Sequence, residues 1–165
     1  MRWPIFLIAI ALHAETGRDA WLRYAPVPVE NLPTCIATID NSPLIQTATG
    51  ELLRGVRGMT GKTLRLASGP AENTILLATL QEIRTTFPAW NLKADLVADA
   101  YWLKSVPSNG VVYTVVTAKN PRGVLYGTFA LLRLMAMGQP ITNLDEQQAP
   151  AASIRWVNQW DRLDG

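Results

Sequence analysis

Residues 111–129 read VVYTVVTAKNPRGVLYGTF and decide the fold of this chain. Positions 111–117 are almost continuously β-branched, which is typical of a central strand buried on both faces. Asn120 can then cap a helix, and Pro121 suits its first turn. The direct passage from a buried strand into a capped helix predicts a domain in which helices pack on a β-sheet.

The predicted helix carries a broad apolar face and is stopped by Gly138 and Pro140. Two neighbouring stripes make up that face, one of Leu125, Phe129, Leu132 and Ala136, the other of Val124, Thr128, Leu131 and Met135. A face of this width is typical of a helix that lies flat on a sheet.

Further strands are expected upstream. Residues 101–106 and 111–117 flank the PSNG sequence at 107–110, whose Asn-Gly step predicts a β-hairpin. Residues 74–80 form a compact apolar run, which predicts a buried strand followed by a short helical or irregular piece up to Pro88.

The amino-terminal part is expected to add two strands and a second long helix. Short apolar stretches at 20–24 and 35–39 are separated by a proline-rich connection. A helix is predicted over residues 43–57, where Leu44, Ala48, Leu52 and Val56 recur at near-helical spacing until Gly58. The predicted fold is therefore α/β, an α+β two-layer unit in which a mixed β-sheet carries two main helices.

Residues 1–14 have the order of a secretory signal peptide, with a positive charge at Arg2, an apolar run over 5–12 and a small residue at Ala14. The apolar run is far shorter than the roughly 20 residues of a membrane helix. The alternative is a first helix of the fold. We therefore expect a secreted protein, extracellular or periplasmic, with no membrane partner after removal of this leader.

The rest of the chain is long enough for one domain with a real core. Without Arg2 it carries 14 Lys and Arg side chains against 13 Asp and Glu. A nearly neutral chain offers no large positive field to attract a phosphate backbone, so no nucleic-acid partner is expected.

Cys35 is the single cysteine, and the single histidine, His13, lies in the predicted leader. One cysteine forms no intrachain disulfide, and Cys35 is expected to be a small buried hydrophobe. The scarcity of imidazole and thiol argues against a zinc site. It also argues against a serine or cysteine nucleophile activated by histidine.

Residues 55–63 end in Gly-Lys-Thr and look like a phosphate-binding loop. Val56 occupies the place where such a loop needs its first glycine, and a helix rather than a strand is predicted before it. The segment is interpreted as a helix end with a glycine cap, and nucleotide binding is not expected.

Four scattered acids, Asp40, Glu51, Asp95 and Asp99, could be considered as a catalytic pair. Nothing in their spacing sets two carboxylates across a sugar substrate. Each is expected to be a solvated surface charge.

Residues 154–165 combine Trp156 and Trp160 with amides and acids in a strand-like segment. Indole faces stack on sugar rings, while amides and carboxylates bind hydroxyls, so the composition suits a sugar-binding rim. It suits equally well a pair of core tryptophans with acids in a turn. Composition leaves both interpretations open.

Several stretches carry a resemblance: GVLYGTF at 123–129, LLRL at 131–134, NQWDRLDG at 158–165 and, upstream, DAWLRY at 19–24, ELLRG at 51–55 and MTG at 59–61. Together they resemble the family 67 α-glucuronidases of the glycoside hydrolases. The sequence departs from the family pattern at two positions. Gln159 stands where the family usually has histidine, and Arg162 replaces a neutral asparagine with a permanent charge.

The resemblance implies the non-catalytic domain of an enzyme that releases (4-O-methyl)-glucuronic acid from its α-1,2 link to xylose in xylo-oligosaccharides, with inversion. A glutamic acid and a second carboxylate would perform this reaction with no metal and no organic cofactor. In that family both acids lie on a following (β/α)8 barrel. No catalytic residue is therefore expected in this chain, which should be inactive alone.

The resemblance also divides the chain into a signal peptide at 1–14, the α-glucuronidase amino-terminal domain at 15–150 and the start of the barrel at 151–165. Trp160 matches a family position where an indole lines the sugar pocket, so substrate binding is expected there. The expected partners are a glucuronoxylan-derived oligosaccharide and the barrel of the same chain. The alternatives are a free-standing carbohydrate-binding module and the equivalent domain of a hexosaminidase.

Overall fold

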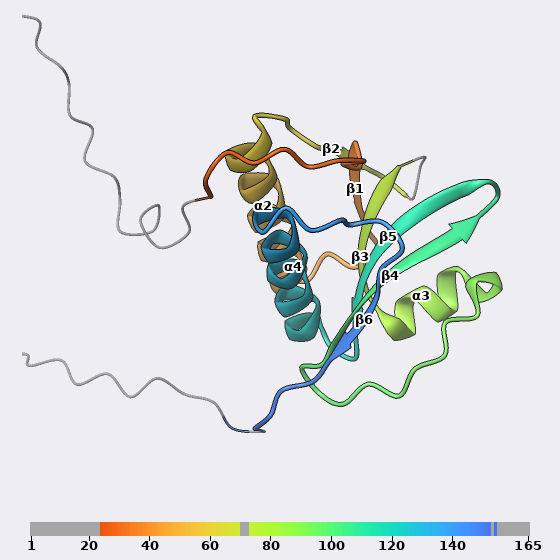
Figure 1. The fold of residues 1–165 in the computed structure, drawn as a ribbon. Coiled ribbons are helices and arrows are strands. Elements are labelled where there is room, and N and C mark those ends of the chain that lie inside the picture. Colours follow the sequence, from red (N-terminus) through yellow and green to blue (C-terminus); the bar gives the residue numbers. More distant parts are fainter. Residues whose placement is uncertain (1–23, 70–72, 153, 155–165) are drawn as a thin grey trace, which may run out of the picture.

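The computed structural model describes residues 24–69, 73–152 and 154. Within them one mixed sheet of six strands has the order β2-β1-β3-β5-β4-β6 (Figure 1). The strands are β1 Cys35–Thr38, β2 Arg65–Ala67, β3 Thr74–Thr79, β4 Tyr101–Ser108, β5 Val111–Ala118 and β6 Asp145–Gln148. Neighbours among β1, β2, β3 and β5 pair parallel, whereas β4 pairs antiparallel with both β5 and β6. The predicted mixed sheet is confirmed.

The helices are α2 Pro43–Thr60, α3 Leu80–Thr86 and α4 Pro121–Ala136, with a short 3-10 turn η1 at Pro88–Trp90. The two long helices, α2 and α4, lie side by side over one face of the sheet (Figure 1). The opposite face is covered by α3, η1 and the connection at 91–100, which bury Ile83, Leu92 and Leu96 against it. The two-layer prediction was therefore incomplete, because this second face has a cover of its own. In the described part of the chain, none of the helices combines the length and the apolar composition needed to cross a membrane.

The predicted hairpin is confirmed as β4 and β5, with Asn109 and Gly110 at φ 52° and 79°. Positive φ at both turn positions is the requirement of the tight turn that an Asn-Gly step favours. Strand β5 lies between β3 and β4, as expected of a central strand, but only its second half, Thr114 to Ala118, is fully buried. Its first half extends beyond the start of β3 in the register of the sheet.

Helix α2 is three residues longer than the predicted 43–57, because Gly61 rather than Gly58 ends it. Gly61 adopts φ 70°, and its amide donates to the carbonyl of Arg57 at 2.9 Å. The start of the predicted apolar stripe was also wrong, since Leu44 is 39% exposed and its neighbour Ile45 is buried.

One short polar strand escaped the sequence pattern. Strand β6 has the sequence DEQQ and is exposed at every position. It is held to β4 by Asp145, which accepts from Trp102 Nε1 at 2.8 Å and pairs with Lys104 Nζ at 2.5 Å. The buried strand predicted at 74–80 and the short helical piece after it are confirmed as β3 and α3. Strand β3 passes directly into α3, because the Thr79 side chain caps the helix and Glu82 completes a capping box.

Helix α4 lies unusually close to the sheet at its first two turns. An added Cβ at Gly123 would stand 2.6 Å from the carbonyl oxygen of Ala100 and 2.7 Å from Cβ of Ala118. One turn later, an added Cβ at Gly127 would stand 2.8 Å from Val116. Any larger side chain at these two positions would push the helix away from β4 and β5.

This contact generates a prediction with an internal control. Gly123→Ala should lower the free energy of unfolding by about 1–3 kcal/mol, because the new methyl group meets backbone that cannot move aside. Gly50→Ala, on the open side of α2 with nothing within 4 Å, should raise it by about 0.5–1 kcal/mol through helix propensity. Urea unfolding followed by circular dichroism measures both, and shifts of the same sign would contradict the close approach.

The attachment of β6 generates a second prediction. Hydrogen bonds from Lys104 and then Trp102 hold the pKa of Asp145 below its ordinary value. A lowered pKa means that this contribution to stability is present above the ordinary carboxyl pKa and is lost as pH falls through the lowered one. The Asp145 side chain is 59% exposed, so Asp145→Asn should cost no more than about 1 kcal/mol at neutral pH and nothing in strong acid.

The control for that series is Asp95→Asn, at an exposed carboxylate. Asp145→Ala should cost more than Asp145→Asn, since it also removes the acceptor of the Trp102 indole. Urea unfolding at a neutral and at a strongly acidic pH distinguishes these variants. A cost of Asp145→Asn that is independent of pH would rule out the ion pair as its source.

Candidate functional site

The carboxyl edge of parallel strands is where α/β domains usually carry their functional groups. At this edge Tyr101 of β4 pairs with Ala118 of β5 on one side and with Gln148 of β6 on the other. A hollow of about 440 Å³ opens here, lined by Asp99, Tyr101, Tyr126, Gln148, Ala149 and Pro150. These six residues and Arg122 are called the exit surface, because the chain leaves the sheet here after β6.

Asp99 organises the exit surface. It directly precedes the β4 region, adopts φ 65° and is only 7% exposed. Its Oδ1 accepts one hydrogen bond from Asn120 Nδ2 at 3.0 Å and another from Arg122 Nε at 2.8 Å. A buried carboxylate requires such donors, because an unpaired charge away from water is strongly destabilising.

Asn120 connects this carboxylate to helix α4. While its Nδ2 donates to Asp99, its Oδ1 accepts from the amide of Gly123 at 2.9 Å, which caps the helix. The negative charge of Asp99 therefore lies next to the amino end of α4, where the helix dipole favours an anion. The predicted cap at Asn120 is confirmed, and it holds Asp99 as well as the helix end.

Arg122 is the cation of the exit surface. Its side chain is 57% exposed although Asp99 holds its Nε. The hydrogen bond and the charge of Asp99 raise the pKa of Arg122 above its ordinary value, so the guanidinium stays charged. One helical turn further along α4, the ring of Tyr126 is 37% exposed.

Tyr101 closes the other side of the hollow. Its hydroxyl donates to Oε1 of Gln148 on β6. Partial burial, and then the negative charge of Glu146, raise the pKa of the Tyr101 phenol, so it stays protonated near neutral pH. The exit surface thus offers a cation, two phenol rings and the small apolar side chains of Ala149 and Pro150, which suit recognition better than acid–base catalysis.

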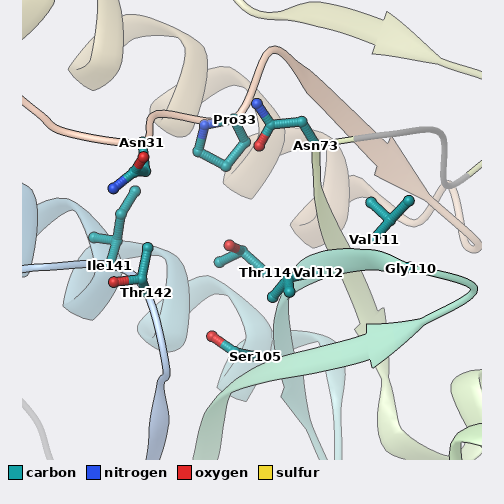
Figure 2. Close-up of a pocket in the computed structure, with 10 residues that line it drawn as sticks. All are labelled: Asn31, Pro33, Asn73, Ser105, Gly110, Val111, Val112, Thr114, Ile141 and Thr142. Carbon is teal, nitrogen blue, oxygen red and sulfur yellow. The ribbon is translucent and has the colours of Figure 1, made fainter.

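A second hollow, of about 490 Å³, lies at the opposite edge of the sheet (Figure 2). Figure 2 shows Asn31, Pro33 and Asn73 on one side of it, Ile141 and Thr142 on another and Ser105 and Thr114 across from them. None of the ten described residues that line it carries an ionisable side chain. The hydroxyl of Ser105 is already engaged by the amide of Leu144 at 2.8 Å. This hollow offers neutral polar groups and no acid or base.

The four scattered acids do not form a pair, but the prediction that each is solvated was wrong for two of them. Glu51 is 7% exposed and bonds Arg54, whose Nε lies 3.1 Å from its Oε2. Asp99 is buried among the donors described above. Asp95 is exposed as expected, and Asp40 is partly exposed near the start of α2.

Two other sequence predictions are confirmed. Cys35 is 1% exposed, as expected for a small buried hydrophobe. Of the segment that ends in Gly-Lys-Thr, residues 55–60 form the end of helix α2, Gly61 caps that helix, and the chain then leads to β2. It is a capped helix end, as interpreted from the sequence, and a helix occupies the place of the strand that a phosphate-binding loop needs before it.

The predicted substrate-binding residue Trp160 lies outside the described residues, and so do Gln159 and Arg162. The predicted leader at 1–14 and most of the predicted strand at 20–24 also lie outside them. The sequence did not single out Arg122 or Tyr126, and it assigned Asp99 to the solvated surface. The signal that could have found them is the sequence Asn-Pro-Arg-Gly at 120–123, which was interpreted only as a cap and a helix start.

Comparison with known proteins places these features in a family. The family model described as glycosyl hydrolase family 67 N-terminus matches residues 20–131, well over half of the chain. That range includes the hairpin, the Asn120 cap, both close-packed glycines and Asp99. Residues 158–165, the last stretch of the resemblance, lie outside the matched range.

The alignments with named relatives cover almost the whole chain. The probable alpha-glucuronidase A of Aspergillus terreus is 38% identical over 100% of this chain and 21% of its own length. The alpha-glucuronidase A of Emericella nidulans is 34% identical over 95% of this chain and 19% of its own, and the alpha-glucuronidase of Hypocrea jecorina is 31% identical over 94% and 19%. The chain thus spans about a fifth of the length of the relatives it matches.

Among solved structures, the GH115 4-O-methyl-alpha-glucuronidase BtGH115A aligns with a TM-score of 0.50 over 62% of this chain and 13% of that one, at 19% identity. This likeness concerns the fold alone. The family match is the stronger finding, since it covers most of the sheet, helix α2 and most of helix α4 together. The chain belongs to the amino-terminal domain family of the family 67 glycosyl hydrolases.

Proposed function

We propose that this chain is the amino-terminal accessory domain of a xylan-degrading α-glucuronidase. The whole enzyme would hydrolyse the α-1,2 bond between (4-O-methyl)-glucuronic acid and xylose in xylo-oligosaccharides, with inversion. The observation that carries the proposal is the match of the entire chain to proteins named alpha-glucuronidase that are about five times as long. The remaining four fifths of such a protein would hold the catalytic barrel.

The arrangement of carboxylates in the described residues supports an accessory role. An inverting glycosidase sets an acid and a base roughly 6.5–9.5 Å apart across its substrate. Here Asp99 is buried under two donors and Glu51 is bonded to Arg54. Asp99 borders the hollow of the exit surface, but its Oδ1 already accepts two hydrogen bonds, and no second acid lines that hollow among the described residues.

In this proposal the chain divides as the resemblance implies, with a leader at 1–14 for export, the accessory domain at 15–150 and the start of the barrel at 151–165. Trp160 would then line the sugar pocket of the assembled enzyme. Its indole would stack on a sugar ring, while the acids of the barrel perform the proton transfers. Neither a metal nor an organic cofactor enters this reaction.

A chimera tests the proposal directly. Residues 15–165 of this chain would replace the matching fifth of the Aspergillus terreus alpha-glucuronidase, and release of glucuronic acid from aldouronic acids would be measured. We expect an active chimera and an inactive 165-residue chain, because the catalytic acids would come from the relative. The control is the same relative with this fifth deleted, which should be inactive.

Two outcomes would count against the proposal. A folded chimera without activity would show that this domain does not serve an α-glucuronidase. Release of glucuronic acid by the 165-residue chain alone would show that it carries its own catalyst. Tight binding of xylo-oligosaccharides by the isolated chain, measured by tryptophan fluorescence, would instead favour the free-standing carbohydrate-binding module.

The role of Trp160 is tested in the same chimera. Trp160→Ala should lower kcat/KM about fivefold or more, since a ring stacked on the substrate contributes on the order of 1 kcal/mol or more. Trp156→Ala, in the same segment, is the matched control and should have the smaller effect on kcat/KM. If the two variants lose kcat/KM equally and melt earlier, the tryptophans belong to the core rather than to the pocket.

A further inference from the structure

We infer that the exit surface is the docking surface for the catalytic part of the full-length enzyme, and that Arg122 receives an acidic group from it. The inference rests on the proposed function and adds where the two parts meet. It concerns Asp99, Tyr101, Arg122, Tyr126 and the segment at 148–150, all at one edge of the sheet.

The course of the chain is the first argument. After β6 the backbone does not turn away from the sheet edge, because Gln148, Ala149 and Pro150 themselves line the hollow beside Tyr101 and Tyr126. Ile154, just beyond, is 70% exposed. In the proposed division of the chain the barrel begins at residue 151, directly after Pro150 of the exit surface.

The exit surface is rigid. The wall of the hollow consists of paired strands and the first turns of α4, which lie too close to β4 and β5 to admit a side chain at Gly123. Asp99 fixes the Nε edge of the Arg122 guanidinium at 2.8 Å. A preorganised surface loses little conformational entropy when a partner binds.

Charge and composition form the third argument. Arginine and tyrosine are enriched at the centres of protein interfaces. Asp99 and Glu146 carry negative charge at this edge, and Arg122 and Arg133 carry positive charge. The amino end of α4 adds a partial positive charge beside the exposed guanidinium of Arg122, which favours a carboxylate on the partner at that point. The apolar ring of Tyr126 lies one turn away and can pack beside that contact.

The opposite edge of the sheet lacks these features. Its hollow, shown in Figure 2, is lined by neutral residues, and the chain does not leave the sheet there. Val112, 54% exposed on the far end of β5, is a suitable reference for that edge. It is an apolar side chain at least as exposed as Tyr126, at the other end of the same sheet.

Cysteine labelling in the chimera described above tests the inference. Tyr126→Cys and Val112→Cys would each be labelled with a maleimide in the 165-residue chain and in the chimera, and site-resolved mass spectrometry would follow each peptide. Native Cys35 is 1% exposed and serves as the slow internal reference. We expect the thiol introduced at position 126 to react at least about tenfold more slowly in the chimera than in the isolated chain. The thiol introduced at position 112 should react equally in both.

The protection of the thiol at position 126 from labelling also tests the role of Arg122 in docking. Arg122→Gln, combined with Tyr126→Cys in the chimera, should return the labelling rate at position 126 toward that of the isolated chain. Arg57→Gln, at an exposed arginine of α2, should leave that rate unchanged. A role of Arg122 confined to its own domain would leave position 126 protected in both variants.

The outcomes separate this inference from the proposed function. An active chimera in which position 126 is labelled as fast as in the isolated chain would overturn the docking surface and leave the accessory role standing. A folded but inactive chimera would contradict the proposed function, and the labelling rates would still decide whether this surface is covered. Protection of position 112 instead of position 126 would place the interface at the opposite edge.

Discussion

The close approach of α4 to β4 and β5 is the constraint on which the exit surface depends. Two glycines one turn apart, Gly123 and Gly127, let the helix backbone touch the sheet where any Cβ would collide with Ala100, Ala118 or Val116. Because the helix starts at that contact, its first capped amide lies directly over the start of β4. The meeting of Asp99 with Asn120 and Arg122 follows from that contact.

Asp99 is placed by the same contact. The carboxylate reaches Asn120 and Arg122 because α4 begins so near Ala100, the residue that follows Asp99. Asp99 makes three interactions at this point. It accepts a hydrogen bond from the Asn120 cap, pairs with the guanidinium of Arg122 and lies at the positive end of the helix dipole. A substitution that moved the helix by about an ångström would disturb all three.

The parts of the fold that the sequence predicted are those whose signal is local. The β-branched run of β5, the Asn-Gly turn and the Asn120 cap each act within a few residues, and each is confirmed. Strand β6 was missed because its four polar residues have no strand pattern and are held by side chains of β4. The burial of Asp99 was missed for the same reason, as its donors lie more than 20 residues away along the chain.

Two of the stretches that carry the family resemblance therefore differ in their physical basis. The first, at 123–129, contains both close-packed glycines, so backbone contact with the sheet constrains it independently of any substrate. The departures from the family pattern, Gln159 and Arg162, both lie in the other stretch, at 158–165, and none lies in the first. A chain can keep its packing contacts and still change side chains that would face a sugar. Packing against the sheet therefore constrains the stretch at 123–129 whatever substrate a member of the family binds.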